Sequence, residues 1–88
     1  MNSYALSARI LLQMPVNLLE RAARMVEIPG YHFTLRHREN SLHGTIRRDF
    51  ADARTYECEI MGGDSSCTCG KSPCRHVAAI CLLARNGD

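Results

Sequence analysis

The stretch Cys67-Thr68-Cys69-Gly70-Lys71-Ser72-Pro73-Cys74-Arg75-His76 decides the fold of this chain. It concentrates three cysteines and one histidine in the pattern C-x-C-x4-C-x-H. Three thiolates and one imidazole complete a tetrahedral set for Zn²⁺ and leave no coordination position for water or substrate. A closed site of this kind stabilises structure. We therefore expect one structural zinc ion, held by Cys67, Cys69, Cys74 and His76, and no enzymatic activity.

The spacing of these four residues requires the chain to change conformation between them. Residues i and i+2 of an extended segment point to the same side, so Cys67 and Cys69 can converge on one ion after a strand. Ser72-Pro73 is a helix-start signal, and an apolar run follows the last ligand. Positions i and i+2 of a helix point to nearly opposite sides. We therefore expect Cys74 at or just before the first helical turn and His76 inside it.

The two remaining cysteines, Cys58 and Cys81, are expected to be buried small hydrophobic residues. The spacing leaves open a ligand set in which one of them replaces His76. A Cys67–Cys69 disulfide would close a very tight ring, which argues against it. An odd number of cysteines with metal-ligand spacing is typical of a reducing compartment, so we expect an intracellular protein, cytoplasmic or nuclear.

The rest of the chain alternates between helical and strand periodicity, which predicts an α+β fold. We expect N-terminal helices, a three-stranded antiparallel sheet, a zinc knuckle and a C-terminal helix. The predicted elements are two helices in residues 3–27 that are split near Met14-Pro15, strands at Tyr31–Arg38, Leu42–Arg48 and Arg54–Met61, and a helix at 74–85. An N-terminal helical segment, 1–29, and a zinc-finger part, 30–88, are expected to form one compact unit.

The ligand pattern, with predicted strands before it and a helix after it, resembles the SWIM zinc finger over roughly residues 30–85. SWIM fingers occur in Mutator-type transposases, helicase-like ATPases, recombination-accessory proteins and ubiquitin-pathway proteins. The resemblance implies a module that binds DNA or another protein, and it does not decide between the two.

The basic residues favour DNA as one partner, although the net charge is only +2. All of them except Lys71 are arginines, whose planar guanidinium binds phosphate through two hydrogen bonds. The residues expected to contact phosphates are Arg36, Arg38, Arg47, Arg48, Lys71 and Arg75. The competing interpretation is a solvated strand face, because Glu57 and Glu59 on the third predicted strand weaken the patch.

The N-terminal helices offer the alternative function, a protein–protein adaptor that recruits a larger enzyme. Leu6, Ile10 and Leu11 form an apolar stripe at helical spacing in the first predicted helix, and Leu19 belongs to the stripe of the second. These residues either pack onto the sheet and the zinc helix or bind a protein partner, which includes a second copy of the chain. No apolar run is long enough to span a membrane, and the first residues lack the basic start of a signal peptide.

A chain of 88 residues buries little surface, so we expect its C-terminal half to lose structure without zinc.

Overall fold

The computed structural model describes residues 3–49, 54–62, 64–71 and 74–86. In this part of the chain, three helices pack on a four-stranded antiparallel sheet of order β1-β2-β3-β4. The elements are α1 (Ser3–Leu11), α2 (Val16–Glu27), β1 (Tyr31–Arg38), β2 (Ser41–Arg48), β3 (Thr55–Met61), β4 (Asp64–Cys67) and α3 (Arg75–Asn86). The α+β class is as expected from the sequence, and the three predicted strands are present within a residue at each boundary.

The fourth strand, β4, corrects the prediction of a three-stranded sheet. The chain turns at Gly62, and Asp64–Cys67 then runs back along β3, so that Cys67 lies opposite Cys58. Pairing continues past the end of β4, where the Thr68 N–H donates to the Glu57 carbonyl at 3.1 Å. Gly63 lies outside the described residues.

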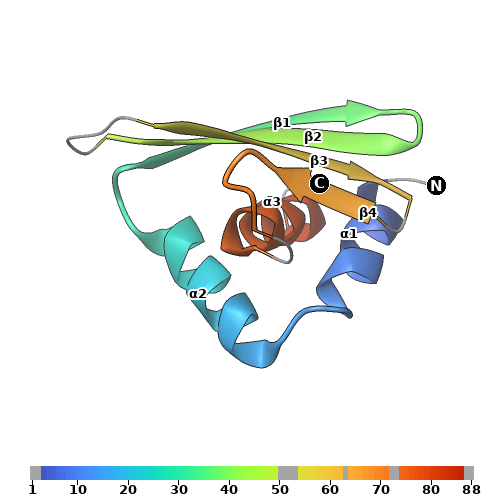
Figure 1. Cartoon of the computed structure of the whole chain (residues 1–88), viewed down its shortest axis with the longest axis horizontal. Coiled ribbons are helices and arrows are strands. Elements are labelled where there is room, and N and C mark those ends of the chain that lie inside the picture. The colour runs from blue at the N-terminus through green and yellow to red at the C-terminus, as the bar shows by residue number, and fades with distance from the viewer. Residues whose placement is uncertain (1–2, 50–53, 63, 72–73, 87–88) are drawn as a thin grey trace.

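The helices all cover one face of the sheet, as Figure 1 shows. On that face Leu42, Ile46 and Ile60 are fully buried. Backbone register places Leu35 opposite Gly44 and Gly44 opposite Cys58, so one row of inward positions crosses three strands. The other face of the sheet carries mainly polar side chains, which is the usual division in an antiparallel sheet covered on one side.

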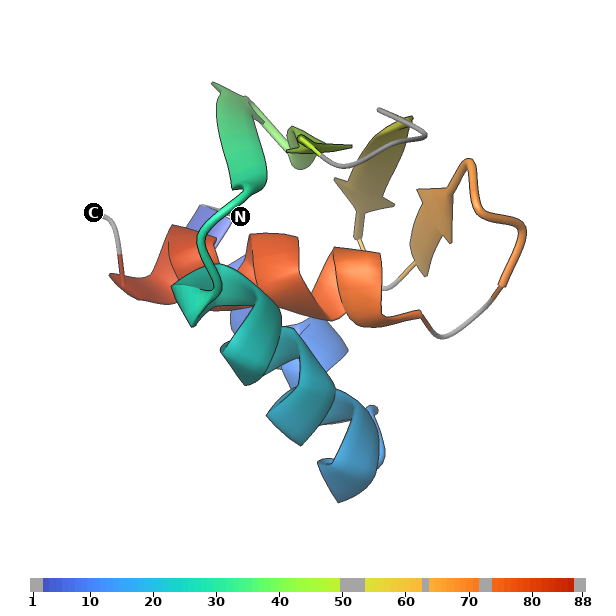
Figure 2. The same cartoon turned by 90° about the vertical axis from the view of Figure 1, so that its left-hand side faces the viewer.

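Helix α3 is the centre of the packing and runs across the strands beneath the sheet (Figure 2). It contacts α1, α2 and all four strands. Its residues Ala78, Ala79, Ile80 and Cys81 are completely buried. A helix that is apolar on most sides has to lie inside the molecule, and small alanines allow its neighbours to approach closely.

The N-terminal helices pack against α3 and break at the predicted place. Helix α1 ends at Leu11, and α2 begins at Val16. Pro15, at the predicted break, has an extended backbone (φ −61°, ψ 148°) and is the residue before α2. None of the three helices in the described ranges is long and apolar enough to cross a bilayer.

The apolar stripe proposed as a partner surface is largely core. Leu6, Ile10 and Leu11 are exposed by only 1%, 4% and 7%, so they cannot serve as the predicted partner-binding residues. Their burial follows from the packing of α1 on α3, which the sequence left as one of two alternatives. Leu19 is partly buried and packs against the same core.

Candidate metal centre

The four predicted ligands come together at one end of α3. Cys67 is the last residue of β4, Cys69 follows it by two positions, Cys74 directly precedes α3, and His76 lies in its first turn. One ligand atom from each residue lies within 4.8 Å of all the others. The sulfurs of a tetrahedral zinc site are roughly 3.8 Å apart, so a small contraction around the ion completes the site. Three sulfurs and one imidazole nitrogen suit zinc, and these four residues would hold one structural ion.

A tight turn brings the chain from the first ligand pair back toward the second. The Gly70 N–H donates to the Cys67 carbonyl at 3.0 Å, and Gly70 has a φ of +82°. Glycine adopts this left-handed conformation without steric cost. The turn directs the thiols of Cys67 and Cys69 toward α3.

The start of α3 stabilises the Cys74 thiolate. The Val77 N–H donates to Cys74 Sγ at 3.4 Å, and the Ala78 N–H donates to the Cys74 carbonyl at 3.2 Å. Zinc with three thiolates carries a net charge of −1, which the partial positive charge of a helix N-terminus favours. The placement of Cys74 before the helix and His76 within it is as predicted. The helix-start signal Ser72-Pro73 lies outside the described residues.

His76 is held in position by an aromatic neighbour. Its ring stacks on Tyr56 of β3 with 4.2 Å between ring centroids and 18° between planes. Its Nδ1 lies 3.7 Å from Cys67 Sγ and so faces the sulfur ligands. Burial, with the positive charges of Arg75, Lys71 and Arg48, lowers the pKa of His76 to about 4. The imidazole is therefore neutral at pH 7, the state in which it can bind a metal ion.

The thiols differ in the environment that the protein provides. Burial raises the pKa of Cys74 to about 12 in the metal-free chain, an effect that the Val77 N–H opposes. For Cys69, burial is outweighed by hydrogen bonds from the Lys71 backbone and the neighbouring thiols, so its pKa is lowered. Zinc binding must therefore displace protons from the site.

Cys58 and Cys81 are not part of the cluster. Burial raises the pKa of Cys81 to about 12, and burial with the neighbouring Cys67 raises that of Cys58 further above its usual range. Both are fully buried, in agreement with their prediction as small hydrophobic residues. His76, and neither of these cysteines, accompanies the other three ligands.

The residues predicted to contact phosphates fall on two different faces. Arg36, Arg38 and Arg47 lie on the open face of the sheet, where Arg47 forms an ion pair with Asp49 at 3.4 Å. The side chain of Arg48 lies on the helix-covered side, with its guanidinium 5.7 Å from the centre of the Tyr31 ring.

The open face has a mixed charge. Glu57 and Glu59 on β3 lie opposite Thr45 and His43 of β2, and His43 in turn lies opposite Arg36 of β1. The carboxylates of β3 therefore share this face with the arginines of β1 and β2, which weakens its attraction for an anion.

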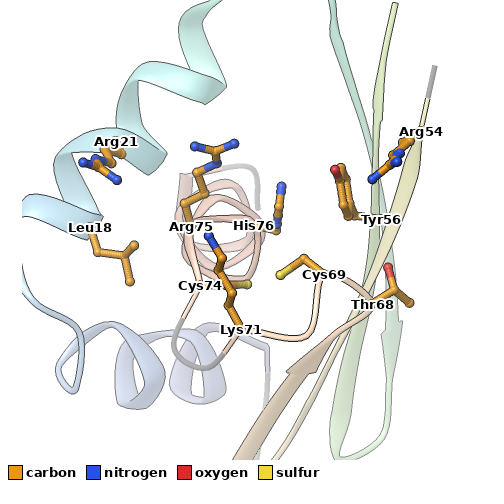
Figure 3. A pocket seen from close by; sticks show the side chains of 10 residues that line it. All are labelled: Leu18, Arg21, Arg54, Tyr56, Thr68, Cys69, Lys71, Cys74, Arg75 and His76. Atoms are coloured by element: carbon orange, nitrogen blue, oxygen red, sulfur yellow. The ribbon is translucent and has the colours of Figure 1, made fainter. Parts of the chain in front are cut away.

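The helix-covered side of the sheet contains a cavity of about 400 Å³ beside the zinc ligands (Figure 3). Lys71 and Arg75 line it, as do Arg21 from α2 and Arg54 from the start of β3. Arg21 and Arg54 were not among the residues predicted to contact phosphates. Arg54 is two positions before Tyr56, and side chains alternate along a strand, so the sequence could have predicted that both lie on the same side of the sheet. Arg21 reaches the cavity only because α2 packs on α3, so no local pattern predicts its position.

The fold and the closed Cys₃His centre define a small zinc-stapled α+β module. Residues 56–84, which contain all four ligands, match the family model of the SWIM zinc finger, so this segment is similar to that family in both sequence and ligand pattern. Comparison with curated proteins and with solved structures gave no match.

Proposed function

We propose that this protein is a zinc-stabilised module that binds nucleic acid through the basic side next to its zinc centre. The observation that carries the proposal is the lining of the cavity. Arg21, Arg54, Lys71 and Arg75 come from four separate segments, and no Asp or Glu is among the described residues that line it. Like charges around one cavity repel one another, and an anion placed between them removes that cost.

The type of cation supports phosphate as the anion. Three of the four lining cations are arginines, whose guanidinium matches two phosphate oxygens at once. Such contacts are largely independent of sequence and position the partner. The role of zinc in this proposal is to fix the positions of Lys71 and Arg75, which neighbour the ligands Cys69, Cys74 and His76.

The alternative is a protein-interaction adaptor that uses the N-terminal helices. Because Leu6, Ile10 and Leu11 are buried, such a surface would have to use Leu12 and Val16 at the α1–α2 connection, which are exposed by 87% and 69%. Two exposed side chains make a smaller surface than the predicted stripe, so we place this function second.

The test compares charge reversal on the two basic faces, with labelled DNA at about 50 and about 200 mM salt. Arg21→Glu with Arg54→Glu should weaken binding at least about tenfold and reduce the salt dependence by about one unit of slope per lost contact. Neither residue adjoins a zinc ligand in the sequence. Arg36→Glu with Arg38→Glu is the matched control, because it makes the same change in charge on the open face.

The result of this comparison decides between the two basic faces and the adaptor function. A loss only in the Arg36/Arg38 pair would move the nucleic-acid surface to the open face of the sheet. Absence of DNA binding by the zinc-loaded wild-type protein at both salt concentrations would refute the proposal and favour the adaptor.

A further inference from the structure

The cavity beside the zinc centre has the size of a ligand site. Its volume of about 400 Å³ lies within the range of roughly 300–1,000 Å³ that is typical of pockets for small molecules and cofactors. Its walls come from α2, the turn after β4, the start of α3 and β3. It is therefore a concave site, distinct from the open face of the sheet.

The charged side chains surround the cavity. In the view of Figure 3, Arg21 lies on α2 on one side and Arg54 lies next to Tyr56 on the other, with Lys71 and Arg75 between them. All four residues are exposed to solvent, so they can turn toward an anion without losing buried contacts.

Apolar contact area accompanies the charges. Leu18 of α2 and Tyr56 of β3 also line the cavity, and both are partly exposed. Tyr56 stacks on His76, so zinc ligation of His76 also fixes the orientation of the tyrosine ring. The rigid ring of Tyr56 and the side chain of Leu18 form an apolar surface on which a nucleotide base can pack. A phosphate group alone would not contact this surface.

We infer that the cavity takes one unpaired nucleotide of a single-stranded nucleic acid, with its phosphate among the four cations and its base against Leu18 and Tyr56. This inference rests on the proposed function and narrows it. In a duplex each base is stacked between its neighbours, so its faces cannot pack against Leu18 and Tyr56. A concave site with charged and apolar walls matches a whole nucleotide, which a single strand or an unpaired end can insert.

The experiment measures binding of a labelled DNA strand of about 12 nucleotides, alone and annealed to its complement, to the zinc-loaded protein. The single strand should bind at least about tenfold more tightly than the duplex. Tyr56→Leu should remove most of this difference. Because Tyr56 supports His76, zinc content and thermal unfolding of the variant are measured in parallel.

A second measurement needs no variant. Single-stranded DNA that carries bromodeoxyuridine is crosslinked by ultraviolet light to the wild-type protein, and the adducts are mapped by mass spectrometry. Crosslinks at Tyr56 or Leu18 support the inference, and crosslinks confined to the open face of the sheet overturn it.

The outcomes separate this inference from the proposed function. Equal affinity for strand and duplex, with both weakened by Arg21→Glu and Arg54→Glu, would overturn the inference and leave the proposed function intact. Failure of both DNA forms to bind would overturn both. Displacement of the single strand by an equal charge concentration of polyglutamate would show that the cavity recognises anionic side chains of a protein instead.

Discussion

Cys58 lies beside the zinc ligands without belonging to them. It is paired across the sheet with Cys67, and it is fully buried. Burial, together with the neighbouring thiols, raises its pKa and keeps it a neutral thiol. Zinc needs thiolates, and the set of Cys67, Cys69, Cys74 and His76 already satisfies a tetrahedral ion. At the scale of single residues, burial and position separate a structural cysteine from a ligand.

We therefore expect Cys58→Ala to retain one zinc ion per chain, whereas Cys69→Ser loses it. Removal of the buried Cys58 sulfur leaves a small cavity, which should cost about 1 kcal/mol of stability. Native mass spectrometry of the two purified variants gives the zinc content. Loss of zinc in Cys58→Ala, with retention in a His76→Ala variant, would place Cys58 in the ligand set.

The zinc ligands could be predicted from the sequence because their chemistry and spacing are local. The residues of the cavity could be predicted only in part. Lys71 and Arg75 adjoin ligands, and strand alternation placed Arg54 on the inner face, but Arg21 depends on how α2 packs. Leu6 and Ile10, which were predicted to bind a partner, show a different limit of sequence-based prediction. An apolar helical stripe has the same pattern whether its own core or another protein covers it.

At the scale of elements, the strand β4 could not be predicted because its residues carry no strand signal. Ser65 and Ser66 are polar, and the segment Asp64–Cys67 is short. Pairing with β3 and fixation of Cys67 at the zinc centre hold it in place. Tertiary contacts override weak local propensity in such a segment. The longer strands β1 to β3 could be predicted because one face of each is buried, so that apolar and polar residues alternate along the sequence.

The packing of α3 on the sheet depends on the absence of a side chain at Gly44 of β2. A Cβ atom at this position would lie 2.5 Å from Ile80 Cδ1 and 2.9 Å from Ile80 Cγ2. Ile80 is fully buried in α3, so its side chain or the strand has to shift to make room for an added methyl group. The close approach of α3 to β2 therefore depends on Gly44, which is far from α3 in the sequence. The alternation of side chains along β2 indicates that Gly44 faces inward, but it does not indicate which residue of α3 lies against it.

We expect Gly44→Ala to lower the free energy of unfolding by about 1–3 kcal/mol, because the added methyl group overpacks the contact with Ile80. Urea unfolding of the zinc-loaded protein measures the effect. Ile80→Val removes the nearest methyl group, so in the double variant Gly44→Ala should cost less than it does alone. Equal costs in the two backgrounds would show that the added methyl group does not meet Ile80.

At the scale of the whole molecule, zinc and α3 connect everything else. The zinc centre joins the end of β4 to the start of α3, and α3 contacts every other described element. A chain of 88 residues has a small core, and domains of this size commonly depend on a metal ion or another cross-link. The sequence predicted that the C-terminal half depends on zinc for its structure. Because α3 packs against α1 and α2, we expect the N-terminal helices to depend on zinc as well.

We therefore expect zinc removal to unfold the helices and the sheet together. A strong chelator should abolish most of the far-ultraviolet circular dichroism signal at 37 °C, or lower the melting temperature by more than about 10 °C, and added zinc should restore it. Amide hydrogen exchange locates the loss, and protection of Ala22 and Met25 in α2 should fall together with that of Ile80 in α3, because both helices share one core. Chelation in the Cys69→Ser variant is the control and should change nothing. If α1 and α2 kept their protection after zinc removal while α3 lost it, the N-terminal helices would form a separate unit, and α3 would not be the element on which the whole fold depends.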